Sequence, residues 1–294
     1  MGNIHITKPV VFTTLALIAF AANSVLCRLA LGGKTIDAAG FTSIRLLSGA
    51  IVLLCILQLR GTKNGSSTNG SWSAAFMLFL YAVTFSFAYL TLNTGTGALI
   101  LFGSVQITMI LRSHLSGTRL LLMEWVGVVV AFSGIVYLVL PGVTAPSLTG
   151  FSLMTLAGIA WGLYSLKGRG STNPLSDTSD NFLRSIPFVI VLGLFFFHDA
   201  HITRQGIILA AISGSITSGV GYTLWYIALR GLSATQAAVV QLSVPVIAGF
   251  GGVVFVSEQI SLRLTLSALL TLGGILMVIL GRNTKTSKYT SKYK

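Results

Sequence analysis

The chain has 294 residues, of which 53% are apolar and only 9% are charged, and its mean hydropathy is +0.86. This composition leaves too little polar surface for a soluble fold and indicates an integral membrane protein. The net charge is +13, but most basic residues stand between apolar segments, where they meet water and anionic head groups, so we expect no nucleic-acid partner.

Apolar segments long enough to cross a bilayer recur along the whole chain. A hydrocarbon core about 30 Å thick needs about 20 helical residues, and ten segments bounded by charged residues, Gly, Pro or Asn approach this length. The sequence therefore predicts an all-α integral membrane fold with ten transmembrane helices. In chain order these are 9–31, 38–59, 72–92, 95–111, 120–140, 148–166, 182–197, 206–229, 235–255 and 262–280.

Basic residues gather on one side when the connecting segments are assigned alternately to the two sides of the membrane. Thirteen of the 19 Lys and Arg fall on the side that holds both termini. Because positive residues flank the cytoplasmic ends of membrane spans, we expect both termini in the cytoplasm and the protein in the inner membrane. Residues 284–294 are predicted to form a basic cytoplasmic tail.

The two halves of the chain resemble each other at an offset of about 140 residues. Phe41-Thr-Ser-Ile-Arg45 aligns with Asp180-Asn-Phe-Leu-Arg184, and an apolar run follows each of them. Each half holds five predicted spans, and because five is odd, the second half enters the membrane from the opposite side. The sequence thus predicts two inverted-topology repeats, 1–145 and 146–283, which is the arrangement that carriers use for alternating access to a central site.

Polar and aromatic side chains within the predicted spans are the candidates for solute binding, because a polar group in hydrocarbon must find a partner or face a cavity. Aromatic rings would stack on a solute, and the amides of Asn23, Gln106 and Gln241 would donate to its polar end. Core packing explains Trp161 and Trp225 about equally well. The candidates are Asn23, Ser24, Arg28, Tyr81, Tyr89, Ser104, Gln106, Trp161, Tyr164, Tyr222, Trp225, Tyr226, Gln241 and Ser243.

Three arginines, Arg28, Arg45 and Arg184, lie inside predicted spans, each within about two turns of a predicted end. This position favours snorkelling to the head groups or an interhelical pair over solute binding. Arg28 is the exception included among the binding candidates, because it follows Asn23 and Ser24 by about one helical turn.

The acidic residues and histidines all fall in predicted loops or at helix ends. Proton-coupled carriers usually need such a group in the pathway, so we expect transport down the solute's own gradient or by exchange. The alternative is a membrane-embedded enzyme, but we find no nucleophile with a base at membrane depth, and Cys27 and Cys55 have no metal-type spacing. We therefore expect no catalytic residue, no metal site and no cofactor.

Three segments resemble the EamA branch of the drug/metabolite transporter superfamily: 21–31 (AANSVLCRLAL), 228–238 (ALRGLSATQAA) and 257–261 (SEQIS). The resemblance covers essentially the whole chain and implies ten helices. As in the YddG-type exporters of aromatic amino acids, it also implies export of amino acids or other small amphipathic metabolites, with a drug or another metabolite as the alternative cargo. The implied partners are a small-molecule solute and the lipid bilayer. The chain departs from the family pattern at Ala21-Ala22, where Trp-Gly is usual, and at Arg119, which aligns with Glu258 of the second half.

Overall fold

A computed structural model describes residues 4–59, 70–115, 121–140, 142, 145–168, 171–230, 232, 237 and 240–291. Within these ranges every regular element is helical, apart from an isolated antiparallel bridge between Ile36 and Ile202. The prediction of an all-helical chain is confirmed. In chain order the elements are α1 (Ile4–Gly32), α2 (Ala38–Leu59), α3 (Trp72–Ala88), α4 (Thr94–Leu115), α5 (Leu122–Val139), α6 (Leu148–Gly168), α7 (Pro174–Phe195), η1 (Phe197–Asp199), α8 (Arg204–Ile212), η2 (Ser213–Val220), α9 (Gly221–Leu229), α11 (Ser243–Val256) and α12 (Leu262–Ser291).

Among the residues that the structure describes, seven helical segments are long and apolar enough to cross a membrane. They lie in α1, α2, α4, α5, α6 and α12 and in the continuous segment Arg204–Leu229, which α8, η2 and α9 form together. The helices α3 and α11 are apolar but shorter, and α7 carries charged residues in its first half. A multi-pass membrane protein is confirmed, and the total of ten spans stays a prediction.

The start predicted for the seventh helix was wrong. Helix α7 begins at Pro174 and not at residue 182, because the Asn173 side chain caps it and proline fits its first position, although these first turns are polar. The apolar part of α12 ends at Gly281, next to the predicted end of the span at residue 280, and the helix itself continues to Ser291. Within the span predicted for 235–255, residues 237, 240 and 241 are helical and α11 runs from Ser243 to Val256. The predicted start at residue 235 lies outside the described ranges, as do 233–236 and 238–239.

Short polar side chains before the helices fix several of the helix starts. The Ser71 hydroxyl accepts from the backbone N–H of Ala74 at the start of α3 (3.2 Å), and the Thr203 hydroxyl does the same for Gly206 in α8 (3.2 Å). Each bond satisfies a backbone donor that the first turn leaves without a helical partner. The helices therefore begin where the sequence supplies a capping residue next to an apolar run.

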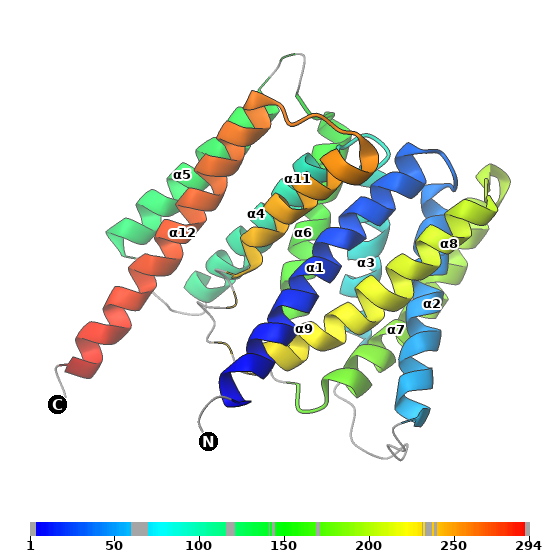
Figure 1. Cartoon of the computed structure of the whole chain (residues 1–294), viewed down its shortest axis with the longest axis horizontal. Helices are drawn as coiled ribbons and strands as arrows, with labels where there is room; N and C mark the ends of the chain where they lie inside the picture. Colours follow the sequence, from blue (N-terminus) through cyan, green and yellow to red (C-terminus); the bar gives the residue numbers. More distant parts are fainter. Residues whose placement is uncertain are drawn as a thin grey trace.

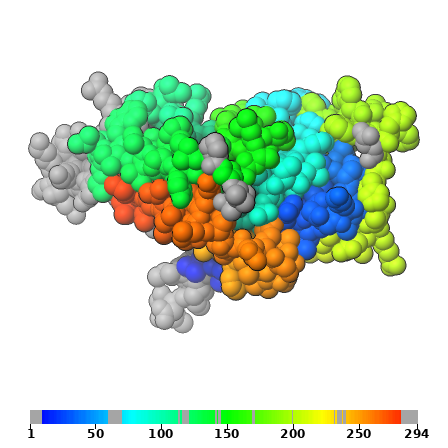
Figure 2. All heavy atoms as spheres, turned by 90° about the horizontal axis from the view of Figure 1, so that it is seen from above, coloured from blue at the N-terminus to red at the C-terminus, as the bar shows by residue number. Residues whose placement is uncertain are grey.

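The helices form an elongated bundle. Helices α5 and α12 pack together at one end of the molecule, and α7 and α8 lie at the other end with α2 (Figures 1 and 2). Between them, α1 contacts α9 and α11, and α6 contacts α3 and α4. Helix α1 begins and α12 ends at the same edge of the bundle (Figure 1). This arrangement brings side chains from both halves of the chain into one interior.

Candidate functional site

A buried arginine lies in the interior of the bundle. Arg45 of α2 is 1% exposed, and its Nη2 donates to the hydroxyls of Tyr222 in α9 (2.8 Å) and Tyr81 in α3 (3.2 Å). Its Nε donates to the hydroxyl of Ser218 in η2 (3.0 Å), and its guanidinium lies 5.0 Å from the centre of the Phe85 ring. Arg45 therefore joins several helices, and the snorkelling alternative is wrong for this residue.

Asn23 of α1 belongs to the same hydrogen-bond network. Its Nδ2 donates to the Tyr81 hydroxyl (3.3 Å), and its Oδ1 accepts from the hydroxyls of Ser213 (2.7 Å) and Thr217 (3.2 Å). Both hydroxyls belong to η2, a π-helical segment, and such segments occur frequently at functional sites. We call the linked set the polar centre; its members are Asn23, Arg45, Tyr81, Ser213, Thr217, Ser218 and Tyr222.

A row of aromatic rings leads away from the polar centre. The Trp161 ring of α6 lies 4.6 Å from the ring of Tyr222 and 5.0 Å from that of Tyr81, measured between ring centres. On its other side Trp161 lies 5.5 Å from Tyr164, which lies 6.2 Å from Tyr226. Trp161, Tyr164 and Tyr226 form what we call the aromatic row.

The aromatic row ends at a polar pocket of about 180 Å³. The hydroxyls of Tyr164 and Tyr226 are buried there. Asp177 lines the pocket as well, is 5% exposed and accepts from the Ser171 hydroxyl. Asp177 lies in the first turn of α7, so its place at a helix end is confirmed, and it is the carboxylate among the residues that line this pocket. The pocket is lined by Ser71, Ala74, Tyr164, Lys167, Gly168, Ser171, Asp177, Asn181 and Tyr226.

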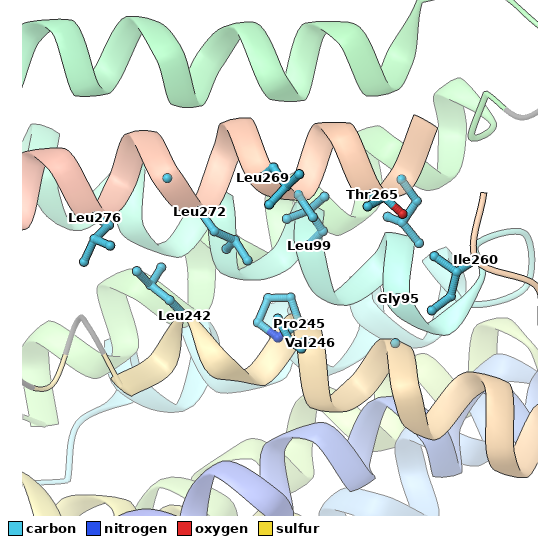
Figure 3. Close-up of a pocket in the computed structure, with 14 residues that line it drawn as sticks. Gly95, Leu99, Leu242, Pro245, Val246, Ile260, Thr265, Leu269, Leu272 and Leu276 are labelled. Atoms are coloured by element: carbon cyan, nitrogen blue, oxygen red, sulfur yellow. The ribbon is translucent and has the colours of Figure 1, made fainter. Parts of the chain in front are cut away.

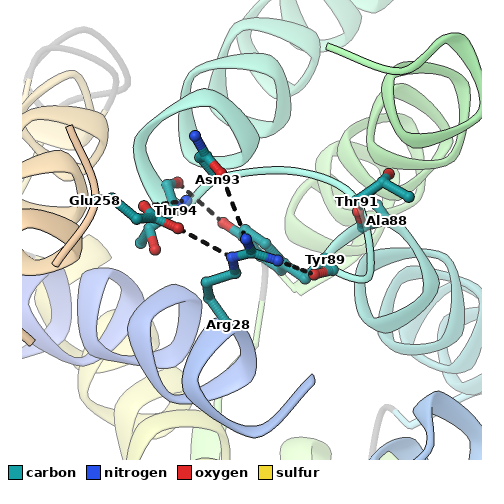
Figure 4. Close-up of polar contacts among 7 residues, drawn as sticks. All are labelled: Arg28, Ala88, Tyr89, Thr91, Asn93, Thr94 and Glu258. Atoms are coloured by element: carbon teal, nitrogen blue, oxygen red, sulfur yellow. Dashed lines mark hydrogen bonds and ion pairs between the residues drawn. The ribbon is translucent and has the colours of Figure 1, made fainter. Parts of the chain in front are cut away.

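A second polar cluster joins α1, the turn between α3 and α4, and the residues after α11 (Figure 4). Arg28 Nε forms an ion pair with Glu258 Oε1 at 2.9 Å, and Arg28 Nη1 donates to the Tyr89 carbonyl oxygen at 3.1 Å. Glu258 Oε2 accepts from the backbone N–H of Thr94 at 2.8 Å, and Asn93 Oδ1 accepts from Arg28 Nη2 at 3.4 Å. We call these five residues the Arg28–Glu258 cluster. Arg28 is thus ion-paired, as one alternative for this arginine held, although its partner Glu258 lies after the last residue of α11, Val256.

The Arg28–Glu258 cluster and the polar pocket lie at opposite ends of the bundle. Helix α3 begins beside Ser71, which lines the pocket, and ends at Tyr89, which belongs to the cluster. At the cluster's end, the turn after α1 is also bonded to the second half. Asp37 N–H donates to the His201 carbonyl oxygen (2.9 Å), and Thr203 N–H donates to the Thr35 carbonyl oxygen (3.0 Å). Several interactions thus bridge the two halves at the end without the polar pocket.

The other predicted site residues lie outside the polar centre. Ser104 packs where α4 meets α6. The two helices are so close there that a Cβ added to Gly158 would lie 2.5 Å from the Cβ of Ser104. Gln241 donates to the Ala237 carbonyl oxygen (3.2 Å) and lines a small hollow with Trp225. Ser243 donates to the Val240 carbonyl oxygen (2.6 Å). Ser24 and Gln106 are buried in α1 and α4.

Sequence reasoning missed four members of the polar centre: Arg45, Ser213, Thr217 and Ser218. One signal for the last three was available, since Ser213-Gly-Ser-Ile-Thr-Ser218 concentrates hydroxyl groups inside an otherwise apolar span. Hydroxyls in hydrocarbon must bond to the backbone or to a partner. Their density on one helix therefore indicates a polar interface.

A larger cavity, of about 460 Å³, lies between α4, α11 and α12 (Figure 3). Its lining includes Leu99, Pro245 and Leu272, and Thr265 supplies the one hydroxyl side chain among the lining residues. None of the predicted binding residues lines it. Because so apolar a surface cannot orient a polar solute, we place the candidate site at the polar centre, the aromatic row and the polar pocket.

Known proteins resemble this chain in sequence and in fold. The sequence profile of the EamA-like transporter family matches the chain twice, over residues 7–140 and 148–280. An uncharacterized protein of Pseudomonas aeruginosa is 45% identical over 94% of this chain and 96% of its own length. The uncharacterized transporter YoaV of Bacillus subtilis is 22% identical over 81% of this chain and 85% of its own length. A solved crystal structure has the same fold, with a TM-score of 0.61 and 17% identity over 91% of this chain and 97% of the other.

Proposed function

The chain belongs to the EamA-like transporter family of the drug/metabolite transporter superfamily, and on this premise we propose that it exports amino acids, including aromatic ones, or other small amphipathic metabolites. The observation that carries the proposal is the aromatic row, which connects a polar pocket at one end of the bundle to a buried polar centre. Rings of this kind stack on an apolar side chain, and hydroxyl and guanidinium groups hold a polar end. Membership of a transporter family also argues against the alternative of a membrane-embedded enzyme.

Alternating access between two inverted repeats, 1–145 and 146–283, is the mechanism we propose. In repeat order α1 to α5 correspond to α6, α7, the segment Arg204–Leu229, α11 and α12. The contact of α3 with α6 then corresponds to the contact of Arg204–Leu229 with α1. In the same way, the contact of α4 with α6 corresponds to the contact of α11 with α1. Such equivalence supports two units that exchange conformations. At the pocket end the Ser71 N–H also donates to Asn181 Oδ1 of the other half (3.1 Å), so the asymmetry that one state of such a cycle requires is the open space of the pocket at that end and the Arg28–Glu258 cluster at the other.

We further propose that the polar pocket faces the cytoplasm of a cell whose inner membrane holds the protein. The excess of Lys and Arg supports cytoplasmic termini. The start of α1 and the end of α12 lie at the edge of the bundle where α9 ends and α7 begins (Figure 1), and residues of α7 and α9 line the pocket. A solute would enter the pocket from the cytoplasm, which is the direction of export.

Counterflow into vesicles reconstituted with the purified protein tests the carrier. We expect saturable exchange of aromatic amino acids, and an uptake about tenfold lower in Trp161→Leu, because the variant removes the ring that joins the row to the polar centre. Trp125→Ala is the matched control, since Trp125 is an exposed ring of α5 outside the row. If no amino acid shows saturable uptake, the exporter proposal loses its basis.

We also propose that transport runs down the solute's own gradient or by exchange. An imposed pH gradient, with equal solute on both sides, is then expected to produce no net accumulation in the same vesicles. Uphill accumulation driven by the pH gradient alone would contradict this expectation. Asp177→Asn would then show whether the carboxylate that lines the pocket carries the proton, because the amide keeps the shape of the side chain and cannot ionise.

A further inference from the structure

The guanidinium of Arg45 has no anionic partner among the described residues. The ion pairs within those residues are Arg28 with Glu258 and Arg184 with Asp180. Arg45 bonds to three neutral hydroxyls, and its Nη1 has no hydrogen-bond partner there. A positive charge is therefore buried deep in the protein with one side of its planar donor group unused.

The corresponding arginine of the second half shows what is missing. The repeat aligns Arg45 with Arg184, and one helical turn before Arg184 stands Asp180, whose Oδ2 lies 3.0 Å from Arg184 Nε. The residue in that place before Arg45 is Phe41, which is buried and apolar. Arg184 is also partly exposed, with 33% of its side-chain surface accessible. The chain thus supplies a counter-ion to the arginine that needs it less.

An arginine cannot reduce the cost of burial by losing its proton, since its pKa is too high in any protein. A buried charge is stable only when it is paired or fully hydrogen-bonded. The planar fork of N–H donors matches a carboxylate, which it can hold through two parallel bonds. The ligand that best complements Arg45 is therefore a carboxylate that arrives with a bound molecule.

We propose that Arg45 binds the carboxylate of the transported solute, an inference that rests on the carrier function proposed above. The rings of Trp161 and Tyr222 lie next to this position and hold the apolar part of the solute, and their faces can also accept an ammonium group. The substrate class is then an amphipathic organic carboxylate. The solute meets the polar pocket first, then the aromatic row, and finally Arg45.

Binding of matched acids and amides to the purified wild-type protein tests the proposal. The probes are two pairs: phenylalanine with phenylalaninamide, and 3-phenylpropionate with 3-phenylpropionamide. The readout is the dependence of the protein's melting temperature on the concentration of each ligand. We expect each acid to bind about tenfold or more tightly than its amide, because bonds between ionised groups are the strong ones. Amides that bind as well as their acids would overturn the proposal.

Two substitutions of equal size at Ser218 provide a second measurement. Ser218→Asp places a carboxylate beside Arg45 Nε, and Ser218→Asn places a neutral amide there, so their comparison isolates the charge. We expect the Asp variant to melt at a higher temperature than the Asn variant, and to have lost the preference for acids over amides. An Asp variant that melts no higher, or that keeps the preference, would contradict an unpaired Arg45.

Arg184→Gln is the control, because it removes the repeat-related arginine that has its own counter-ion. It is expected to keep the wild-type preference for acids. The comparison of the two Ser218 variants needs no transport, so it shows whether the Arg45 charge lacks a counter-ion even if counterflow fails. Saturable counterflow with equal binding of acids and amides would overturn the Arg45 proposal alone and leave the carrier intact.

Discussion

Replacing Gly214 with alanine is expected to lower the free energy of unfolding by about 3 kcal/mol, at the upper end of overpacking costs, and to abolish transport. A Cβ at Gly214 would lie 2.0 Å from the Arg45 carbonyl oxygen and 2.1 Å from the Ser48 hydroxyl oxygen. The first contact involves backbone, which no side-chain rotation can relieve. The alanine therefore forces α2 and η2 apart at the residue that holds the polar centre together.

Gly193→Ala is the matched control, because a Cβ at this exposed position of α7 would meet nothing within 4 Å. It is expected to be neutral or slightly stabilising, since alanine favours helix over glycine by up to about 1 kcal/mol. Thermal unfolding in detergent and counterflow measure both effects. If Gly214→Ala behaves like Gly193→Ala, the close approach of α2 and η2 is not required for the folded carrier.

Removing the charge of Glu258 is expected to release the bridged end of the bundle and to shift the protein away from the state described above. The Arg28 and Glu258 side chains are 19% and 12% exposed, so their pair is partly shielded from water. A double-mutant cycle of Arg28→Gln and Glu258→Gln should give a coupling free energy of about 1 to 3 kcal/mol in thermal unfolding. The same cycle on Arg184 and Asp180, a more exposed pair one turn apart on α7, should give at most about 0.5 kcal/mol.

Cysteine labelling at the polar pocket reports the shift between states. Lys167 lines the pocket and is exposed, so a Lys167→Cys variant should react with a hydrophilic maleimide. Exposed Cys55 is first replaced by serine, and Cys27 is buried. With Glu258→Gln added we expect slower labelling, because opening one end closes the other in alternating access. Unchanged labelling together with a coupling free energy near zero would show that the Arg28–Glu258 cluster does not hold that end.

The helices that could be predicted best are those whose ends coincide with a change from polar to apolar sequence. Helix α2 has the predicted bounds, because Asp37 stands directly before it and the apolar run ends at Leu59. Helix α7 was predicted too short because its first turns are polar, and apolar length does not detect a helix start that a cap and a proline determine.

The candidate site could be predicted only in part. Asn23, Tyr81 and Tyr222 were expected to bind solute together and do share one network. Arg45 was judged by its distance from the end of its own span, which favours snorkelling, whereas its partners Ser218 and Tyr222 lie 173 and 177 residues further along the chain. The hydroxyl-rich run 213–218 indicates a polar interface, but the local pattern does not identify Arg45 as the partner.

The sequence by itself determined that this protein lies in a membrane, that it is helical and that its two halves are related. Apolar length and charge placement are local properties of the chain, and repetition is visible when the chain is aligned with itself. Only the tertiary structure decided which polar groups meet. Whether a polar side chain in a span faces lipid, a partner or a cavity depends on helices that are distant in the chain, as the ion pair between Arg28 and Glu258, 230 residues apart, illustrates. The physical reason is that side chains project all around a helix, and the packing of other helices determines which face of it is buried.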